Sequence, residues 1–146
     1  MTTKIKFRKP SNYDVAVAKM GVPFTYTDND GNKYGTFTVS LFNLDSKFVR
    51  IGMERFGREN KEALGKLEDA EKRGVFTFIN TALHGWEGVQ DENGKDVPFS
   101  RENAMALLFD PEDDDDGMFN ELVKFSQNKA NFKHDPRSTK DDEAKN

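Results

Sequence analysis

The 146-residue chain contains no cysteine and only two histidines. Without cysteine, neither a disulfide scaffold nor a cysteine-ligated zinc site is possible. The sequence also has no long apolar run, which argues against a membrane-spanning helix. Because the basic segment 1–10 is followed by no apolar stretch, we expect no secretory signal. Together these absences favour a cytoplasmic protein.

Aliphatic side chains are scarce, and aromatic rings take their place. Leu, Ile, Val and Phe together number 33 of the 146 residues, just above the range in which disorder becomes the default. Thirteen of these are phenylalanines, and one buried aromatic side chain covers roughly 150–250 Å². We therefore expect one domain with a small core that is built largely from rings.

The formal net charge is -4, but charge is unevenly distributed along the chain. Residues 1–90 hold 14 basic and 11 acidic side chains, whereas residues 91–146 hold 8 basic and 15 acidic ones. This asymmetry indicates that the two halves face different partners or each other.

The first half of the chain begins with a strong hairpin signal. Two segments rich in β-branched and aromatic residues, 23–27 and 33–41, flank a turn that contains Asp-Gly. In the second segment Phe37, Val39 and Leu41 alternate with polar side chains, which predicts a half-buried strand. The preceding segment 13–20 is compatible with either a short helix or a strand.

Residues 45–83 place apolar side chains at near-helical spacing and predict an intermittent helical arm. We expect a break near residues 57–60 or a kink at a glycine, because glycine inside a helix costs about 1 kcal/mol relative to alanine. We expect His84-Gly85 to end the last of these helices.

The second half predicts a turn and two helices. Asn93-Gly94 indicates a second hairpin-like turn within 86–99. Ser100 is a suitable N-cap for a short helix that Asp110-Pro111 ends. Helical spacing returns from Met118 to about Lys129.

These elements predict an α+β fold in which an N-terminal β-hairpin or small antiparallel sheet packs with a mainly helical C-terminal part. We assign residues 1–132 to a single domain. Residues 133–146 contain no large apolar side chain, and we expect them to form a disordered polar tail.

Three acidic turns, around Gly31, Gly94 and Gly117, invite comparison with calcium-binding loops. That geometry needs a bidentate glutamate at the twelfth position of the loop. The residues found there are Phe37, Ser100 and Val123. We interpret all three as structural turns and expect no metal site.

Segment 110–116 holds six acidic residues in seven positions. We interpret this acidic run as a solvated loop whose charge suits the positive end of the following helix. Docking of a basic partner and mimicry of a nucleic acid backbone are the functional alternatives.

No local sequence motif indicates a catalytic site. His84 and His134 lie far apart in sequence, and a nucleophile elbow, a phosphate-binding loop and paired motif carboxylates are all missing. We predict that the protein is not an enzyme and has no cofactor. The basic residues in segment 4–9 are too few to predict nucleic acid binding on an acidic chain, and we expect no membrane binding.

An ordered set of short motifs runs through the second half. Leu-His-Gly-Trp-Glu-Gly-Val at 83–89 precedes the acidic Asn93-Gly94 turn and a Val-Pro-Phe-Ser helix start at 97–100. A last amphipathic helix then closes on Ala-Asn-Phe at 130–132. With this order of parts the chain resembles the tail assembly chaperones of long-tailed bacteriophages, over about residues 20–132.

The resemblance implies a non-enzymatic protein made in the infected host cell. Such chaperones bind the long helical tape measure protein and keep it soluble until tail tube subunits polymerise around it. The implied partners are the phage tape measure protein, the tail tube protein and further copies of the chain. The implied location is the host cytoplasm, with no copies in the mature virion. A minor structural protein of the phage tail and an acidic nucleic-acid mimic are the alternatives.

A tape measure protein exposes apolar helical stripes, which a groove of apolar side chains can cover. For this contact we predict two sets of residues. The first is Phe76, Ile79, Leu83 and Trp86, and the second is Phe119, Leu122 and Phe125. Packing inside the core is the competing interpretation for each of them.

Overall fold

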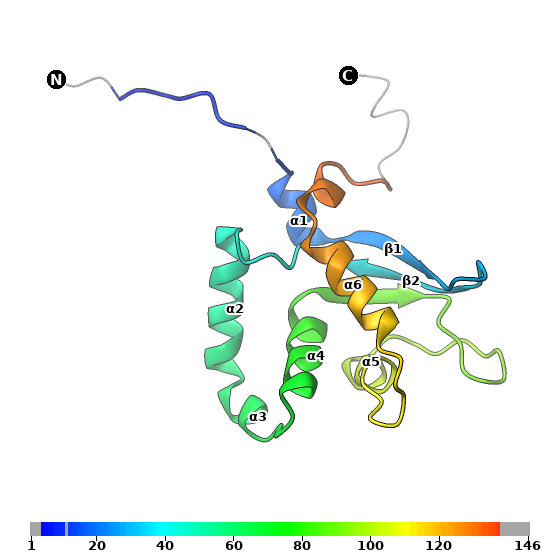
Figure 1. The fold of residues 1–146 in the computed structure, drawn as a ribbon. Coiled ribbons are helices and arrows are strands. Elements are labelled where there is room, and N and C mark those ends of the chain that lie inside the picture. The colour runs from blue at the N-terminus through cyan, green and yellow to red at the C-terminus, as the bar shows by residue number, and fades with distance from the viewer. Residues whose placement is uncertain (1–3, 11, 138–146) are drawn as a thin grey trace.

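The structure is a computed structural model that describes residues 4–10 and 12–137 (Figure 1). Three antiparallel strands and six α-helices form the described part, which confirms the predicted α+β fold. The elements in chain order are α1 (Val15–Met20), β1 (Val22–Thr27), β2 (Lys33–Val39), α2 (Lys47–Glu59), α3 (Lys61–Gly65), α4 (Ala70–Thr81), β3 (Leu83–Glu87), α5 (Arg101–Leu108), α6 (Gly117–Gln127) and the 3₁₀ helix η1 (Lys129–Phe132).

The predicted hairpin is present as β1 and β2, and β2 is the central strand of the sheet. Asp28 organises the connecting turn. Its carboxylate accepts hydrogen bonds from the backbone N–H groups of Asn32 at 2.8 Å and Asp30 at 2.9 Å, and from the Tyr34 hydroxyl at 3.1 Å. These bonds, led by the one from the Asn32 backbone, hold the pKa of Asp28 below its ordinary value.

The third strand, β3, lies where the sequence predicted the end of a helix. α4 already ends at Thr81, and residues Leu83–Glu87 pair antiparallel with β2. The expected helix stop at His84-Gly85 is therefore wrong. The open edge of β2 supplies backbone hydrogen bonds that side-chain periodicity does not reveal, and this tertiary pairing overrides the helical pattern.

The helical arm is divided into three helices. Asn60 separates α2 from α3, which confirms the predicted break near residues 57–60, and segment 66–69 separates α3 from α4. Within the ambiguous segment 13–20, residues Val15–Met20 form α1. Asp14 explains this outcome, because its carboxylate accepts hydrogen bonds from two backbone N–H groups of the first turn.

The predicted start of α5 is also confirmed, since the Ser100 hydroxyl accepts a hydrogen bond from the Asn103 N–H at 2.9 Å. The Asn93-Gly94 turn is present, with Gly94 at φ +77°. It does not lead into long strands, because the only β-bridge described around it joins Gln90 to Asp96.

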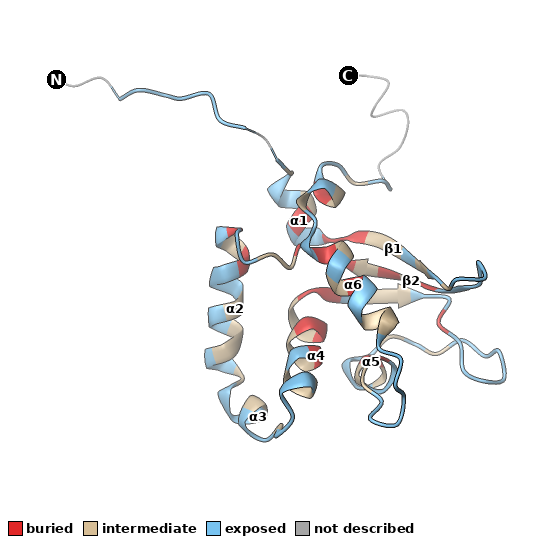
Figure 2. Ribbon diagram, in the orientation of Figure 1, coloured by how far each residue is buried: buried red, intermediate tan, exposed pale blue. Residues whose placement is uncertain are grey.

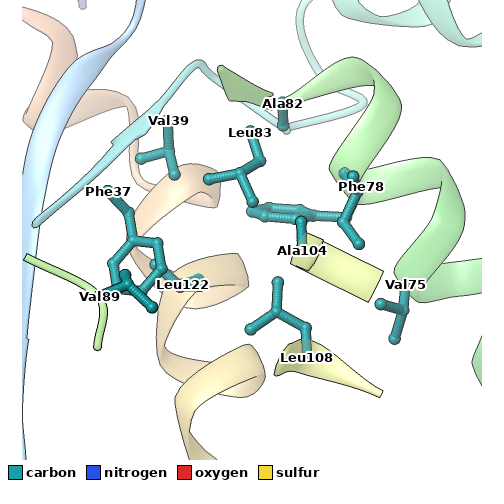
Figure 3. Close-up of a cluster of buried hydrophobic side chains, with 11 residues drawn as sticks. Phe37, Val39, Val75, Phe78, Ala82, Leu83, Val89, Ala104, Leu108 and Leu122 are labelled. Atoms are coloured by element: carbon teal, nitrogen blue, oxygen red, sulfur yellow. The ribbon is translucent and has the colours of Figure 1, made fainter. Parts of the chain in front are cut away.

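The main core lies between the sheet and helices α4, α5 and α6 (Figures 2 and 3). Phe37 and Val39 of β2 are completely buried there, as their alternation predicted. The other buried members of this cluster are Val75, Phe78, Ile79, Ala82, Leu83, Val89, Ala104, Leu108 and Leu122.

A second, smaller cluster joins α1, the first turn of α2 and η1. Its buried members are Ala18, Val22, Leu41, Val49 and Phe132. The cluster holds the two ends of the domain together, and the Asp14 N–H donates to the Phe132 carbonyl at 2.9 Å. Just after η1, the Arg137 guanidinium donates to the Gly21 carbonyl at 2.7 Å. The remainder of the predicted tail, 138–146, lies outside the described residues.

Candidate functional site

An apolar groove of about 540 Å³ lies between α2 and α4. Residues 40–42, just after β2, and Lys19 of α1 also line it. Figure 1 shows α2 and α4 linked through α3. Most of the side chains that line it are large and apolar. They are Leu41, Phe42, Phe48, Ile51, Met53 and Phe56, with Lys19, Arg55 and Glu59 as the charged members.

α2 packs against the domain through only part of its surface, with Phe48, Val49 and Met53 at the smaller core cluster and Phe56 at α4. Val49, near the start of the helix, is the one buried residue of α2 and belongs to the smaller core cluster. Phe56, near the α3 end, contacts Phe76 of α4 with ring centroids 5.8 Å apart. Between these two anchors Ile51 remains 45% exposed. At Ile51, the middle of α2 therefore presents apolar surface to solvent within the described chain.

A second hollow of about 350 Å³ continues the groove past Phe42 and Met53, which line both. It includes Leu44, which is 61% exposed. Isolated exposed apolar residues are normal on protein surfaces, whereas a contiguous apolar depression is typical of a binding site.

The seven predicted contact residues lie mostly elsewhere. Ile79, Leu83 and Leu122 are at most 1% exposed and belong to the main core cluster. They contribute to folding and offer no free surface to a partner.

The aromatic residues of the predicted set are partly buried and packed on one another or on neighbouring rings. Trp86 contacts Phe37 and Phe99 edge-on, at 6.0 and 5.1 Å between ring centroids, and its indole Nε1 donates to the Val97 carbonyl at 2.8 Å. Phe119 contacts Phe78 edge-on at 5.6 Å. These contacts place both rings against the main core cluster.

Phe125 and Phe76 occupy different surroundings. Phe125 lies between the two core clusters, 4.6 Å from Phe24 and 6.2 Å from Phe132 between ring centroids. Phe76 is the one predicted residue that reaches α2, through Phe56.

Sequence reasoning thus recognised the apolar spacing of α2 but did not select its residues as a contact surface. Phe48, Ile51 and Phe56 recur at helical spacing, as the residues of a buried face would. Which apolar faces find a partner within the same domain depends on the packing of distant elements, and spacing does not report that.

The acidic run 110–116 forms an exposed loop between α5 and α6. Its aspartates bond to the local backbone, as when the Asp113 carboxylate accepts from the Asp115 N–H and the Asp115 carboxylate accepts from the Gly117 N–H, each at 2.9 Å. Within residues 4–10 and 12–137, no three His, Asp or Glu side chains are grouped as a metal site would require.

The side chain of His84 is exposed on β3. Desolvation by neighbouring atoms, and secondarily the charge of Arg101, lowers the pKa of its imidazole. The Arg101 guanidinium itself donates to the Leu83 carbonyl at 3.0 Å and lies over the Phe99 ring. The surroundings of His84 thus favour the neutral imidazole.

Comparison with known proteins identifies the origin of this α+β domain. The family model described as YdaY prophage protein matches residues 11–146, which is nearly the whole chain. The chain therefore belongs to the YdaY prophage protein family and is phage-derived. No curated protein and no solved structure matches it. No helix among the described residues is long and apolar enough to cross a membrane.

Proposed function

We propose that this prophage protein is a tail assembly chaperone, which binds the tape measure protein in the host cytoplasm and assists tail tube polymerisation. It acts by binding alone, without a catalytic site or a cofactor, and is absent from the mature virion. Two findings support the proposal. The family is phage-derived, and the order of motifs at 83–132 resembles that of tail assembly chaperones.

The groove between α2 and α4 is the observation that carries the proposal. A tape measure protein is a long helix with apolar stripes, and a groove lined by large apolar side chains is the usual receptor for such a stripe. The groove offers Phe48, Ile51 and Met53 from one helix, and it continues to the exposed Leu44. We therefore assign partner contact to the groove, and core packing to most of the residues predicted from sequence.

The direct test is co-expression of the full chain with the tape measure protein of the same prophage, followed by pull-down and by comparison of the soluble fraction of the partner. We expect the partner to co-purify and to become soluble. A partner that stays insoluble and unbound would contradict the proposal. Finding the chain in purified virions would favour a minor structural protein of the tail instead.

Two variants localise the contact. Ile51→Ser removes an exposed apolar side chain from the groove, and Leu107→Ser removes one of similar exposure, 37%, from α5. Both substitutions are at the surface, so we expect both variants to fold. The groove variant should lose co-purification of the partner while the α5 variant keeps it. An equal loss of co-purification in both variants would show that the partner contact lies elsewhere or is unspecific.

A further inference from the structure

The groove carries a fixed pattern of charge in addition to its apolar surface. Lys19 stands at one end, with its Nζ 5.5 Å from the centre of the Phe48 ring. Arg55 follows Phe48 by seven residues on α2, which is two helical turns or about 10 Å along the axis. Two positive charges therefore border the apolar floor about two turns apart.

Neither side chain forms an ion pair within the described part of the chain. The ion pairs found there join Lys66 to Glu62 and Arg137 to Asp135, and no carboxylate lies within 4.0 Å of the side-chain nitrogens of Lys19 or Arg55. The one acidic side chain lining the groove is Glu59, at the α3 end. The charged residues that line the groove are thus two basic and one acidic, and α2 as a whole holds four basic and two acidic residues, although the chain is acidic.

We propose that the groove selects an amphipathic helix whose apolar stripe is bordered by acidic side chains, with two carboxylates about seven residues apart that face Lys19 and Arg55. Complementary charge at the border of an apolar contact raises the association rate and suppresses wrong partners. This inference rests on the proposed function, since it specifies which stripe of a tape measure protein would be bound.

The charge of the groove also argues against occupants from the chain itself. The exposed N-terminal segment 4–9 has apolar Ile5 and Phe7, but its four other residues are basic and would be repelled by Lys19 and Arg55. α2 of a second copy carries the same excess of basic residues. An acidic helix from a different protein is the complementary occupant.

Two synthetic peptides of about 18 residues, long enough to form a helix on binding, would test this inference with the full chain. Both carry the same leucine stripe. One has glutamate at two positions seven residues apart beside the stripe, and the other has lysine there. We expect the glutamate peptide to bind at least about tenfold more tightly at low salt, and the difference to shrink at high salt because the charges are screened.

Charge reversal in the protein gives the matched experiment. The double variant Lys19→Glu with Arg55→Glu should prefer the lysine peptide, and Ile51→Ser should weaken binding of the glutamate peptide to an otherwise intact groove. Circular dichroism of each variant checks that the fold is retained. Equal affinity of both peptides for the unmodified chain, or an unchanged preference after charge reversal, would overturn the inference. If neither peptide binds while the tape measure protein still co-purifies, the inference fails and the proposed function stands.

Discussion

Phe56 of α2 and Phe76 of α4 face each other with ring centroids 5.8 Å apart and ring planes inclined by 42°. This contact fixes the distance between the two helices on the α3 side of the groove. At the other end Val49 is held in the smaller core cluster, so the aromatic pair and this buried valine together keep the groove open along the middle of α2.

We predict that Phe56→Ala loosens α2. Both rings are only partly buried, so the free energy of unfolding should fall by about 1–2 kcal/mol, below the range for fully buried phenylalanines. The double-mutant cycle with Phe76→Ala should give a coupling energy of about 0.5–1.5 kcal/mol, as direct aromatic pairs do. Urea denaturation of the four proteins measures both quantities. Additive effects of the two substitutions would show that the rings do not interact.

Trp86→Ala and Phe119→Ala separate core packing from partner contact for two of the residues predicted from sequence. Because both rings pack against buried phenylalanines, we expect each substitution to lower the free energy of unfolding by about 2–4 kcal/mol. Loss of partner binding with unchanged stability would restore the original interpretation of these residues as contact surface.

Trp86→Phe is the control for the polar part of the same side chain. It keeps a ring beside Phe37 and Phe99 but removes the hydrogen bond from Nε1 to the Val97 carbonyl. We expect a loss of about 1 kcal/mol, the usual net contribution of one such bond. Because Trp86 is the only tryptophan, circular dichroism and not fluorescence must follow unfolding of this variant.

Gly35→Ala should be strongly destabilising. Gly35 has φ +140°, and a Cβ there would lie 2.7 Å from Cγ2 of the buried Val89. We expect a loss of about 2 kcal/mol or more from steric overlap and backbone strain. The double variant with Val89→Ala should regain part of the stability that the steric overlap removes. Thermal unfolding of the single and double variants measures this gain.

Gly57→Ala provides a matched glycine substitution with the opposite sign. Gly57 lies inside α2, and no neighbouring atom lies within 4 Å of the position its Cβ would take. Alanine should therefore stabilise the protein by up to about 1 kcal/mol. Destabilisation in this variant would indicate that the open side of α2 is more restricted than the structure shows.

The lowered pKa of His84 predicts a pH dependence of stability. The unfolded chain takes up a proton near the ordinary value of 6.5, whereas the folded chain resists protonation. The free energy of unfolding should therefore fall as the pH drops through 6.5 and level off below the lowered pKa of the folded state. His84→Gln should flatten this part of the profile, measured by urea denaturation between about pH 7.5 and 5. An unchanged slope would mean that His84 does not cause it.

Several elements could be predicted because their signals are local. Asp-Gly in a β-rich context indicated the first hairpin, and Ser100 indicated the start of α5 through its ability to bond the Asn103 N–H. The alternation of Phe37 and Val39 correctly predicted which side of β2 is buried. Each of these outcomes depends on residues within a few positions of one another.

The strand β3 and the candidate site could not be predicted in the same way. Leu83 continues the helical spacing of α4, yet it lies in a strand because the distant edge of β2 accepts it. Likewise, Ile79 and Ile51 both lie on apolar helix faces, and only tertiary packing decides that the first is buried and the second 45% exposed.

By itself, therefore, the sequence determined the fold class, the turns and caps, and the aromatic character of the core, since these follow from side-chain chemistry and short-range spacing. The tertiary structure alone decided which apolar faces cover one another. The hydrophobic effect is not directional, so one apolar stripe can be buried against any other apolar stripe. In this chain α4, α5 and α6 cover the sheet, and the middle of α2 is left as the groove.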